Sequence, residues 1–178
     1  FNACVETLKS LGVEVIETNL PSADDFRLAN NLGLIISRVE AAAYQRAFPD
    51  AGPLYIKQVF EQLDEASQIK AVDYITAQRF RAEFQERMLA ELKGFDAFIM
   101  PTTLVPAVKA EETEQYLTIL SRNCIPWSMI GFPTLSVPAG LTSGGLPVGA
   151  QFVGAPFDDG IILALASALE SVTEDLRP

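Results

Sequence analysis

Apolar residues recur at three- and four-residue steps over much of the chain, and this spacing predicts amphipathic helices. The two longest runs cover residues 22–47 and 71–93, and the first opens with a helix-start signature at Ser22 and Asp25. Shorter runs of the same kind bring the expected number of helices to about six: residues 3–11, 54–64, 116–122 and the segment that follows Asp158.

Other segments alternate between apolar and polar residues or are apolar throughout, which is typical of β-strands. Residues 13–17 alternate, residues 95–100 and 148–153 are mostly apolar and end before Pro101 and Gly154, and residues 134–137 form a short strand closed by Pro138. We therefore expect an α/β fold with a mixed β-sheet of about four strands covered by about six helices.

Residues 123–157 contain no Asp, Glu, Lys or Arg, although 20% of the chain is charged. They hold six of the 11 glycines and five of the 11 prolines. This composition favours buried strands joined by tight turns, with Gly149 at a close backbone approach. Gln151 interrupts an apolar strand there, and we expect its amide to bond a neighbouring loop, because an unpaired buried amide costs about 1–3 kcal/mol.

Composition and charge exclude several classes of function. A net charge of −10 argues against binding to a nucleic acid backbone. No run has the length of a membrane span, no basic amphipathic helix fits a membrane surface, and the two cysteines match no metal or redox spacing. We expect a cytoplasmic protein with no metal, no cofactor and no membrane partner. The hydrophobic content of 49% predicts self-association or packing against a further part of a larger domain.

The chain contains no histidine, so Ser-His-Asp and Cys-His sites are excluded. A base would have to be a Lys, a carboxylate or a group outside these residues. The expected helix at 3–11 followed by a strand at 13–17 is typical of the second half of a β-α-β unit. We therefore expect the chain to be part of a larger domain.

Two motifs in the uncharged stretch carry a family resemblance. Residues 131–140 read G-F-P-T-L-S-V-P-A-G, and residues 145–151 read G-L-P-V-G-A-Q. They resemble the C-terminal half of the amidase signature family, which commonly reads G-x-P-x-x-x-x-P-x-G and then G-L-P-x-G-x-Q. Residues 96–102 also resemble its D-x-x-x-x-P-T strand end, and residues 71–74 its A-x-D-Y helix start.

The resemblance implies a serine hydrolase of amides that uses a Ser nucleophile, a second Ser and a Lys base. The Gly/Ser-rich signature and the catalytic Lys of that family lie in its N-terminal half. We therefore expect residues 1–178 to form the C-terminal portion of an amidase-signature domain, without catalytic residues and inactive alone. The intact enzyme would act on a small-molecule amide.

The residues before the G-F-P motif, Ile125, Pro126, Trp127 and Ser128, occupy the place where the family often lines its pocket. The resemblance therefore implies that they bind substrate from an uncharged loop, although Trp127 is also consistent with plain core packing. Arg122 is consistent with a surface residue or with one that meets a substrate carboxylate.

Two other functions remain open. The glutamine-hydrolysing A subunit of a tRNA-dependent amidotransferase resembles the same family, but it typically carries an acidic residue shortly before the G-x-P motif. Residues 118–124 contain none, which favours an amidase. The other alternative is a binding or scaffolding module without catalysis.

Overall fold

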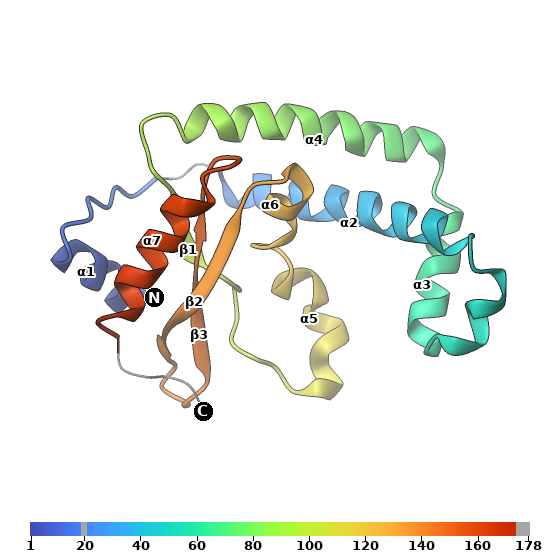
Figure 1. The fold of residues 1–178 in the computed structure, drawn as a ribbon. Coiled ribbons are helices and arrows are strands. Elements are labelled where there is room, and N and C mark those ends of the chain that lie inside the picture. Colours follow the sequence, from blue (N-terminus) through green and yellow to red (C-terminus); the bar gives the residue numbers. More distant parts are fainter. Residues whose placement is uncertain (19–20, 174–178) are drawn as a thin grey trace.

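Helices form most of the structure, a computed structural model that describes residues 1–18 and 21–173 (Figure 1). Among these residues, none of the helices has both the length and the hydrophobicity to cross a lipid bilayer. The α-helices are α1 (Asn2–Ser10), α2 (Ala23–Gln45), α3 (Lys57–Ser67), α4 (Ala71–Glu91), α5 (Thr113–Leu120), α6 (Ile125–Ile130) and α7 (Asp159–Glu170), with 3₁₀ turns η1 (Pro49–Leu54) and η2 (Ala110–Glu112).

The sheet within the described residues has three strands in the order β1-β3-β2: β1 (Phe98–Pro101), β2 (Thr134–Leu141) and β3 (Pro147–Val153). Both pairs are antiparallel. The predicted α/β fold with helices over a sheet is confirmed. The sheet itself differs from the prediction, because it has three strands among the described residues instead of about four, and its pairs are antiparallel instead of mixed. Residues 13–17 form no strand, since no described strand lies beside them to complete a ladder.

Strand β2 runs past Pro138, where the sequence predicted its end. The register with β3 shifts between Pro138 and Gly140, which marks a β-bulge. A proline has no N–H for a ladder, but it is tolerated on an edge strand and at a bulge, and β2 is an edge strand. The chain therefore keeps its pairing up to Leu141.

The helices cover both faces of the sheet, and each face has its own apolar core. On one face, α2, α4 and α6 pack with Phe98 and Val153. On the other face, α1 and α7 pack with Val137 and Phe152 (Figure 1). Because side chains alternate along a strand, consecutive residues of β3 enter different cores.

Most helices begin where the sequence predicted. Ser22 and Asp25 form the reciprocal capping box at the start of α2. Helix α3 begins three residues later than expected, because η1 takes up the prolines before it. Helix α6 was not predicted, because this segment was expected to be a loop. The helix has Pro126 in its first turn and ends at Gly131, whose φ is 74°.

Candidate functional site

The sheet face that packs against α6 is covered at one end and open at the other. At the covered end, Phe98 and Val153 belong to the buried cluster that contains α6. At the other end, Thr102 is half-buried and Ser136 is exposed. This polar end, together with residues 121–124 and α6, is the candidate site.

Two hydroxyl groups meet across the middle strand of the sheet. Thr102 Oγ1 and Ser136 Oγ lie 2.5 Å apart, over Gly149 of β3. The backbone N–H of Thr102 donates to the carbonyl of Gly149 at 2.9 Å. A Cβ at position 149 would lie 2.7 Å from Thr102 Oγ1 and 2.8 Å from Ser136 Oγ. The sequence predicted a close backbone approach at Gly149, but the groups that approach it are side chains, and the missing Cβ lets the two hydroxyls meet.

Residues 121–124 are held against the sheet by side-chain hydrogen bonds. Gln151 Nε2 donates to the carbonyl of Asn123 at 2.8 Å, which confirms the predicted bond from this amide to a neighbouring loop. Asn123 Nδ2 donates to the carbonyl of Pro101 at 2.8 Å, and Cys124 Sγ donates to the carbonyl of Thr102 at 3.4 Å. The loop before α6 is thus fixed to the end of β1 and to the central strand β3.

The four residues predicted to bind substrate lie on α6, with different exposures. Pro126 and Trp127 are fully buried. Ile125 is half-buried and lies against Gly33 of α2, where an added Cβ would come within 2.5 Å of Ile125 Cγ2. Ser128 is exposed, and its hydroxyl donates to the carbonyl of Cys124 at 3.3 Å. Substrate contact by these residues stays a prediction.

Trp127 is surrounded by aromatic rings. Its ring centroid lies 5.6 Å from that of Phe26 in an edge-to-face arrangement, 5.8 Å from Phe98 and 6.1 Å from Phe132. The indole N–H is buried and has no hydrogen-bond partner among the residues that the structure describes. Core packing, the alternative left open by the sequence, therefore describes Trp127 in this structure.

Within the site, Arg122 is half-buried and its Nε is buried without a partner in the described part of the chain. The neighbouring Ser121 donates its hydroxyl to Asn30 Oδ1 at 2.9 Å. Asn30 is itself buried in α2 and donates to the carbonyl of Thr118 at 3.4 Å. These bonds fix Asn30, whereas the Arg122 side chain carries an unused donor.

The sequence pattern did not indicate that Thr102, Ser136 and Asn123 belong to one site. The signal was present, because Thr102 lies in the P-T motif and Ser136 in the S-V-P motif. The missing information was the register that sets Pro138 of β2 opposite Gly149 of β3. Without the register, nothing indicated that the two hydroxyls reach across β3.

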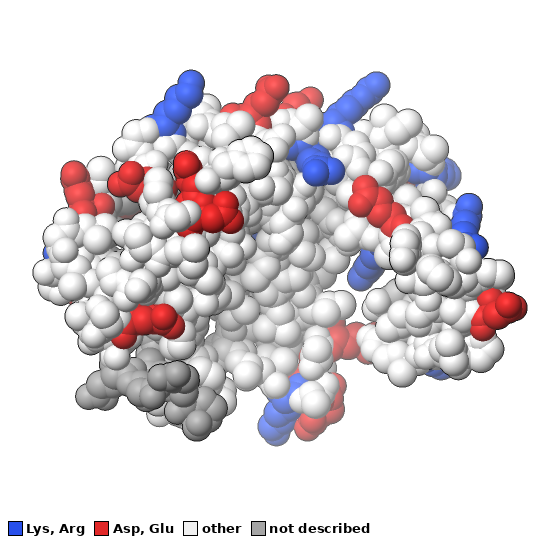
Figure 2. Space-filling view, viewed as in Figure 1, with Lys and Arg blue, Asp and Glu red and all other residues white. Residues whose placement is uncertain are grey.

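The groups at this site can form hydrogen bonds, but they include no nucleophile with a base. They are hydroxyls, amides, backbone carbonyls, the guanidinium of Arg122 and the thiol of Cys124. Burial raises the pKa of Cys124, so its thiol stays protonated at neutral pH. Figure 2 shows no charged side chain in the middle of the face over β2 and α6. Residues 1–18 and 21–173 contain no group of three or more His, Cys, Asp or Glu that could hold a metal ion.

Comparisons with known proteins give a consistent result. A family model described as Amidase matches residues 1–163. The chain is 30% identical to the fatty acid amide hydrolase of Arabidopsis thaliana, over 95% of this chain and 30% of that protein. It is 39% identical to the A subunit of the glutamyl-tRNA(Gln) amidotransferase of Myxococcus xanthus, over 54% of this chain and 21% of that protein.

Solved structures show the same fold. An amidase crystal structure superimposes with a TM-score of 0.83 at 29% identity, over 98% of this chain and 41% of that one. The chain therefore spans well under half the length of the relatives that it matches.

Proposed function

Because this chain belongs to the amidase signature family, we propose that it is part of an enzyme that hydrolyses the carbon–nitrogen bond of a small-molecule amide. The observation that carries the proposal is the family match over residues 1–163. Within that enzyme, the chain supplies core and one wall of the substrate pocket.

The polar end of the sheet has the chemistry that an amide needs from a pocket wall. An amide presents a carbonyl acceptor and, when primary or secondary, an N–H donor. The oxygens of Thr102, Ser136 and Ser128 can all accept a hydrogen bond, and the bonded Thr102–Ser136 pair keeps one O–H free to donate. Because the loop before α6 is fixed to the sheet, these groups keep defined positions. The wall thus orients the substrate by hydrogen bonds.

The reacting groups belong to another part of the enzyme in this proposal. By the family resemblance they are a Ser nucleophile, a second Ser and a Lys base. Nothing at the polar end replaces them, since the hydroxyls of Thr102 and Ser136 bond to each other and no base adjoins them in the described part of the chain. We therefore expect the 178-residue chain to be inactive by itself.

Treatment with a fluorophosphonate probe tests this expectation. The isolated chain should gain no mass by intact mass spectrometry, and it should release no product from a chromogenic anilide. The Pseudomonas putida amidase, which is 29% identical over 96% of this chain, serves as the control under the same conditions. Stoichiometric labelling of any Ser in the isolated chain would overturn the assignment of the reacting groups to another part.

The A subunit of an amidotransferase is the second candidate, favoured by the 39% identity to the Myxococcus xanthus protein. Against it, residues 118–124 contain no acid that could hold the amine of glutamine. Backbone NMR of the chain, titrated with glutamine and with propionamide, separates the two. We expect no preference for glutamine at Thr102 or Ser128. A selective response to glutamine would put the amidotransferase first.

A further inference from the structure

Arg122 is the only charged residue in the segments that build the candidate site. These segments are residues 97–108, which contain β1 and Thr102, and residues 115–157, which run from α5 through β3. Apart from Arg122 they contain no Asp, Glu, Lys or Arg. Because charges interact more strongly where protein replaces water, this single guanidinium determines the sign of the potential at the site.

The guanidinium of Arg122 has no acidic partner. No ion pair between described residues includes it. The nearest acids along the chain are Glu114, in the first turn of α5, and Asp158, just before α7, whereas Arg122 follows the last turn of α5. The chain has 23 acidic residues against 13 basic ones, so a shortage of carboxylates does not explain this unpaired arginine.

One donor of this group is withheld from water as well as from the protein. Nε of Arg122 is buried and has no hydrogen-bond partner among the described residues, although the side chain as a whole is only half-buried. A buried donor of a charged group is unfavourable when it stays unpaired. An anionic acceptor beside the guanidinium would relieve that cost, and the desolvation of Nε is already complete before it binds.

The backbone is anchored on both sides of Arg122. The hydroxyl of Ser121 donates to Asn30 Oδ1 at 2.9 Å, and Asn123 Nδ2 donates to the carbonyl of Pro101 at 2.8 Å. The base of the Arg122 side chain therefore keeps a fixed place beside the end of β1. A few charged or polar groups in fixed positions are what orient a ligand in a largely apolar pocket.

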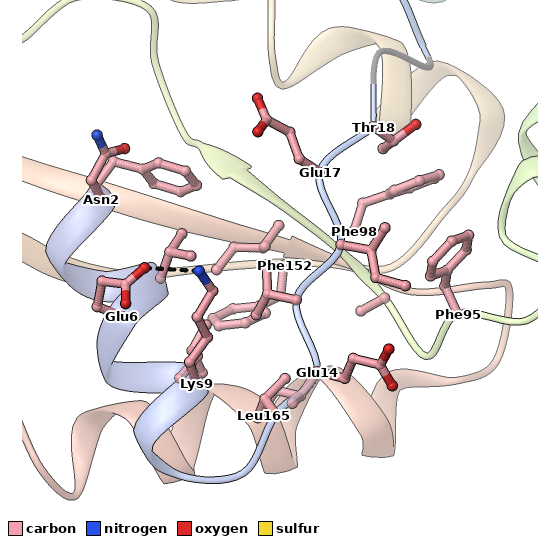
Figure 3. A pocket seen from close by; sticks show the side chains of 18 residues that line it. Asn2, Glu6, Lys9, Glu14, Glu17, Thr18, Phe95, Phe98, Phe152 and Leu165 are labelled. Carbon is pink, nitrogen blue, oxygen red and sulfur yellow. Dashed lines mark hydrogen bonds and ion pairs between the residues drawn. The ribbon is translucent and has the colours of Figure 1, made fainter.

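The cavity beside α1 offers no competing place for an anion. It has a volume of about 560 Å³, and the carboxylates of Glu6, Glu14 and Glu17 lie around it (Figure 3). Lys9, the one lysine among the described residues that line it, is paired with Glu6 at 2.8 Å. The charges there disfavour an anionic ligand, whereas the charge of Arg122 favours one.

We propose that Arg122 is a specificity-determining residue, which binds a carboxylate of the substrate. The substrate class is then an amide that also carries a carboxylate, with no ammonium group beside that carboxylate. The guanidinium suits this role because its planar fork can donate two parallel N–H bonds to the two carboxylate oxygens. The inference rests on the proposed function, since it assigns the substrate of the same site.

The absence of acids from residues 118–124 defines the second half of this specificity. An ammonium group next to the carboxylate would approach Arg122 with no acid to pair it, and such a mismatch selects against a ligand. Glutamine is a ligand of this kind. It should therefore gain nothing over an uncharged amide, in contrast to an amide whose carboxylate stands alone.

A matched set of small molecules tests the proposal. Glutaramate has both an amide and a carboxylate; glutamine adds an ammonium group to it, butyramide lacks the carboxylate, and butyrate lacks the amide. Each is titrated into the 178-residue chain, and nitrogen–proton NMR follows the Nε–H signal of Arg122. We expect glutaramate to shift this signal with a half-saturating concentration at least about tenfold lower than that of the other three.

Substitutions then test whether Arg122 itself makes the selection, with the backbone amides of Thr102 and Asn123 as the signals. Arg122→Gln should abolish the preference for glutaramate over butyramide, and Arg122→Lys should keep only part of it, because an ammonium lacks the fork. The control Arg79→Gln removes an exposed charge on α4 and should keep the full preference. If Arg122→Gln disturbs the whole spectrum, the Lys variant and the Nε–H signal of the unsubstituted chain decide.

Four results would overturn the proposal. The first is no response of the Arg122 signal to glutaramate up to about 50 mM. The second is an equal response to butyrate, which would show general anion binding, and the third is an equal response to glutamine or butyramide. The fourth is a preference for glutaramate that survives Arg122→Gln. None of these readouts depends on fluorophosphonate labelling or anilide hydrolysis, so the failure of this proposal and the failure of the proposed function are distinguishable.

Discussion

Trp127 joins the candidate site to the core. Its ring packs against three aromatic side chains, while the next residue, Ser128, is exposed at the site. The sequence predicted that both residues bind substrate, but it could not say which side of the segment faces inward. The inward-facing side is set by the helical turn of α6. This helix has only six residues and a proline in its first turn, so the sequence pattern did not predict it.

Substitution of Trp127 separates packing from substrate contact. Trp127→Ala should lower the free energy of unfolding by about 3–5 kcal/mol, because it leaves a cavity in the aromatic cluster. Trp127→Phe should cost much less, because it keeps a ring and removes a buried N–H without a described partner. Urea unfolding measures both. A loss of several kcal/mol in the Phe variant would mean that the indole N–H makes a bond important for stability.

Gly149 is the second residue whose identity the site requires. Gly149→Ala places a methyl group within 2.8 Å of both hydroxyl oxygens, so we expect a loss of about 1–3 kcal/mol in unfolding free energy. The combined change T102A/S136A removes both hydroxyl oxygens. It should restore most of that loss in a double-mutant cycle. If Gly149→Ala lowers the unfolding free energy equally in the unsubstituted chain and in the combined variant, the steric explanation is contradicted.

At the scale of elements, the start of α2 is tied to α4. Asp25 accepts hydrogen bonds from the backbone N–H of Ser22 at 2.9 Å and from the Ser22 hydroxyl at 2.7 Å. The guanidinium of Arg87 on α4 lies 2.5 Å from the other carboxylate oxygen. Burial alone would raise the pKa of Asp25, but the hydrogen bonds from Ser22 and the charge of Arg87 together hold the pKa below its ordinary value.

This lowered pKa gives a pH dependence with a defined sign. The folded state favours ionised Asp25, so its contribution is present above the unfolded pKa of about 4 and is lost as pH falls through the folded value. Asp25→Asn should cost about 1 kcal/mol at pH 7, and the difference should shrink below about pH 4. Urea unfolding at several pH values measures it. The control Asp24→Asn, in an exposed pair with Arg27, should change stability by only a few tenths of a kcal/mol.

The long elements were predictable because each carries its own signals. The capping box and the repeated apolar positions define α2, and the same periodicity defines α4. Residues 13–17 show the limit of this reasoning. Their alternation predicted a strand, but a strand exists only with a partner, and no pattern within a segment shows whether its partner lies in the same chain.

At the scale of the whole molecule, the two apolar cores lie on either side of the sheet, whereas one edge of β1 has no strand beside it among the described residues. Large apolar side chains remain exposed there, with Ile16 at 56% and Phe95 at 43%. The hydrophobic content and the resemblance to one half of a family domain predicted a surface that packs against a further part or another copy, and this packing stays a prediction. The sequence could not locate the surface, since residues 13–17 and 97–99 meet only through the tertiary fold.

The hydrogen bond from Gln151 to Asn123 has a consequence for the thermodynamics of binding. It fixes the loop before α6 from the central strand, and Asn123 fixes the end of β1 in turn. A pocket wall that is already ordered loses little conformational entropy when an amide arrives. In the proposed enzyme, most of the entropic cost of binding would then fall on the substrate and on the part of the pocket that the other residues supply.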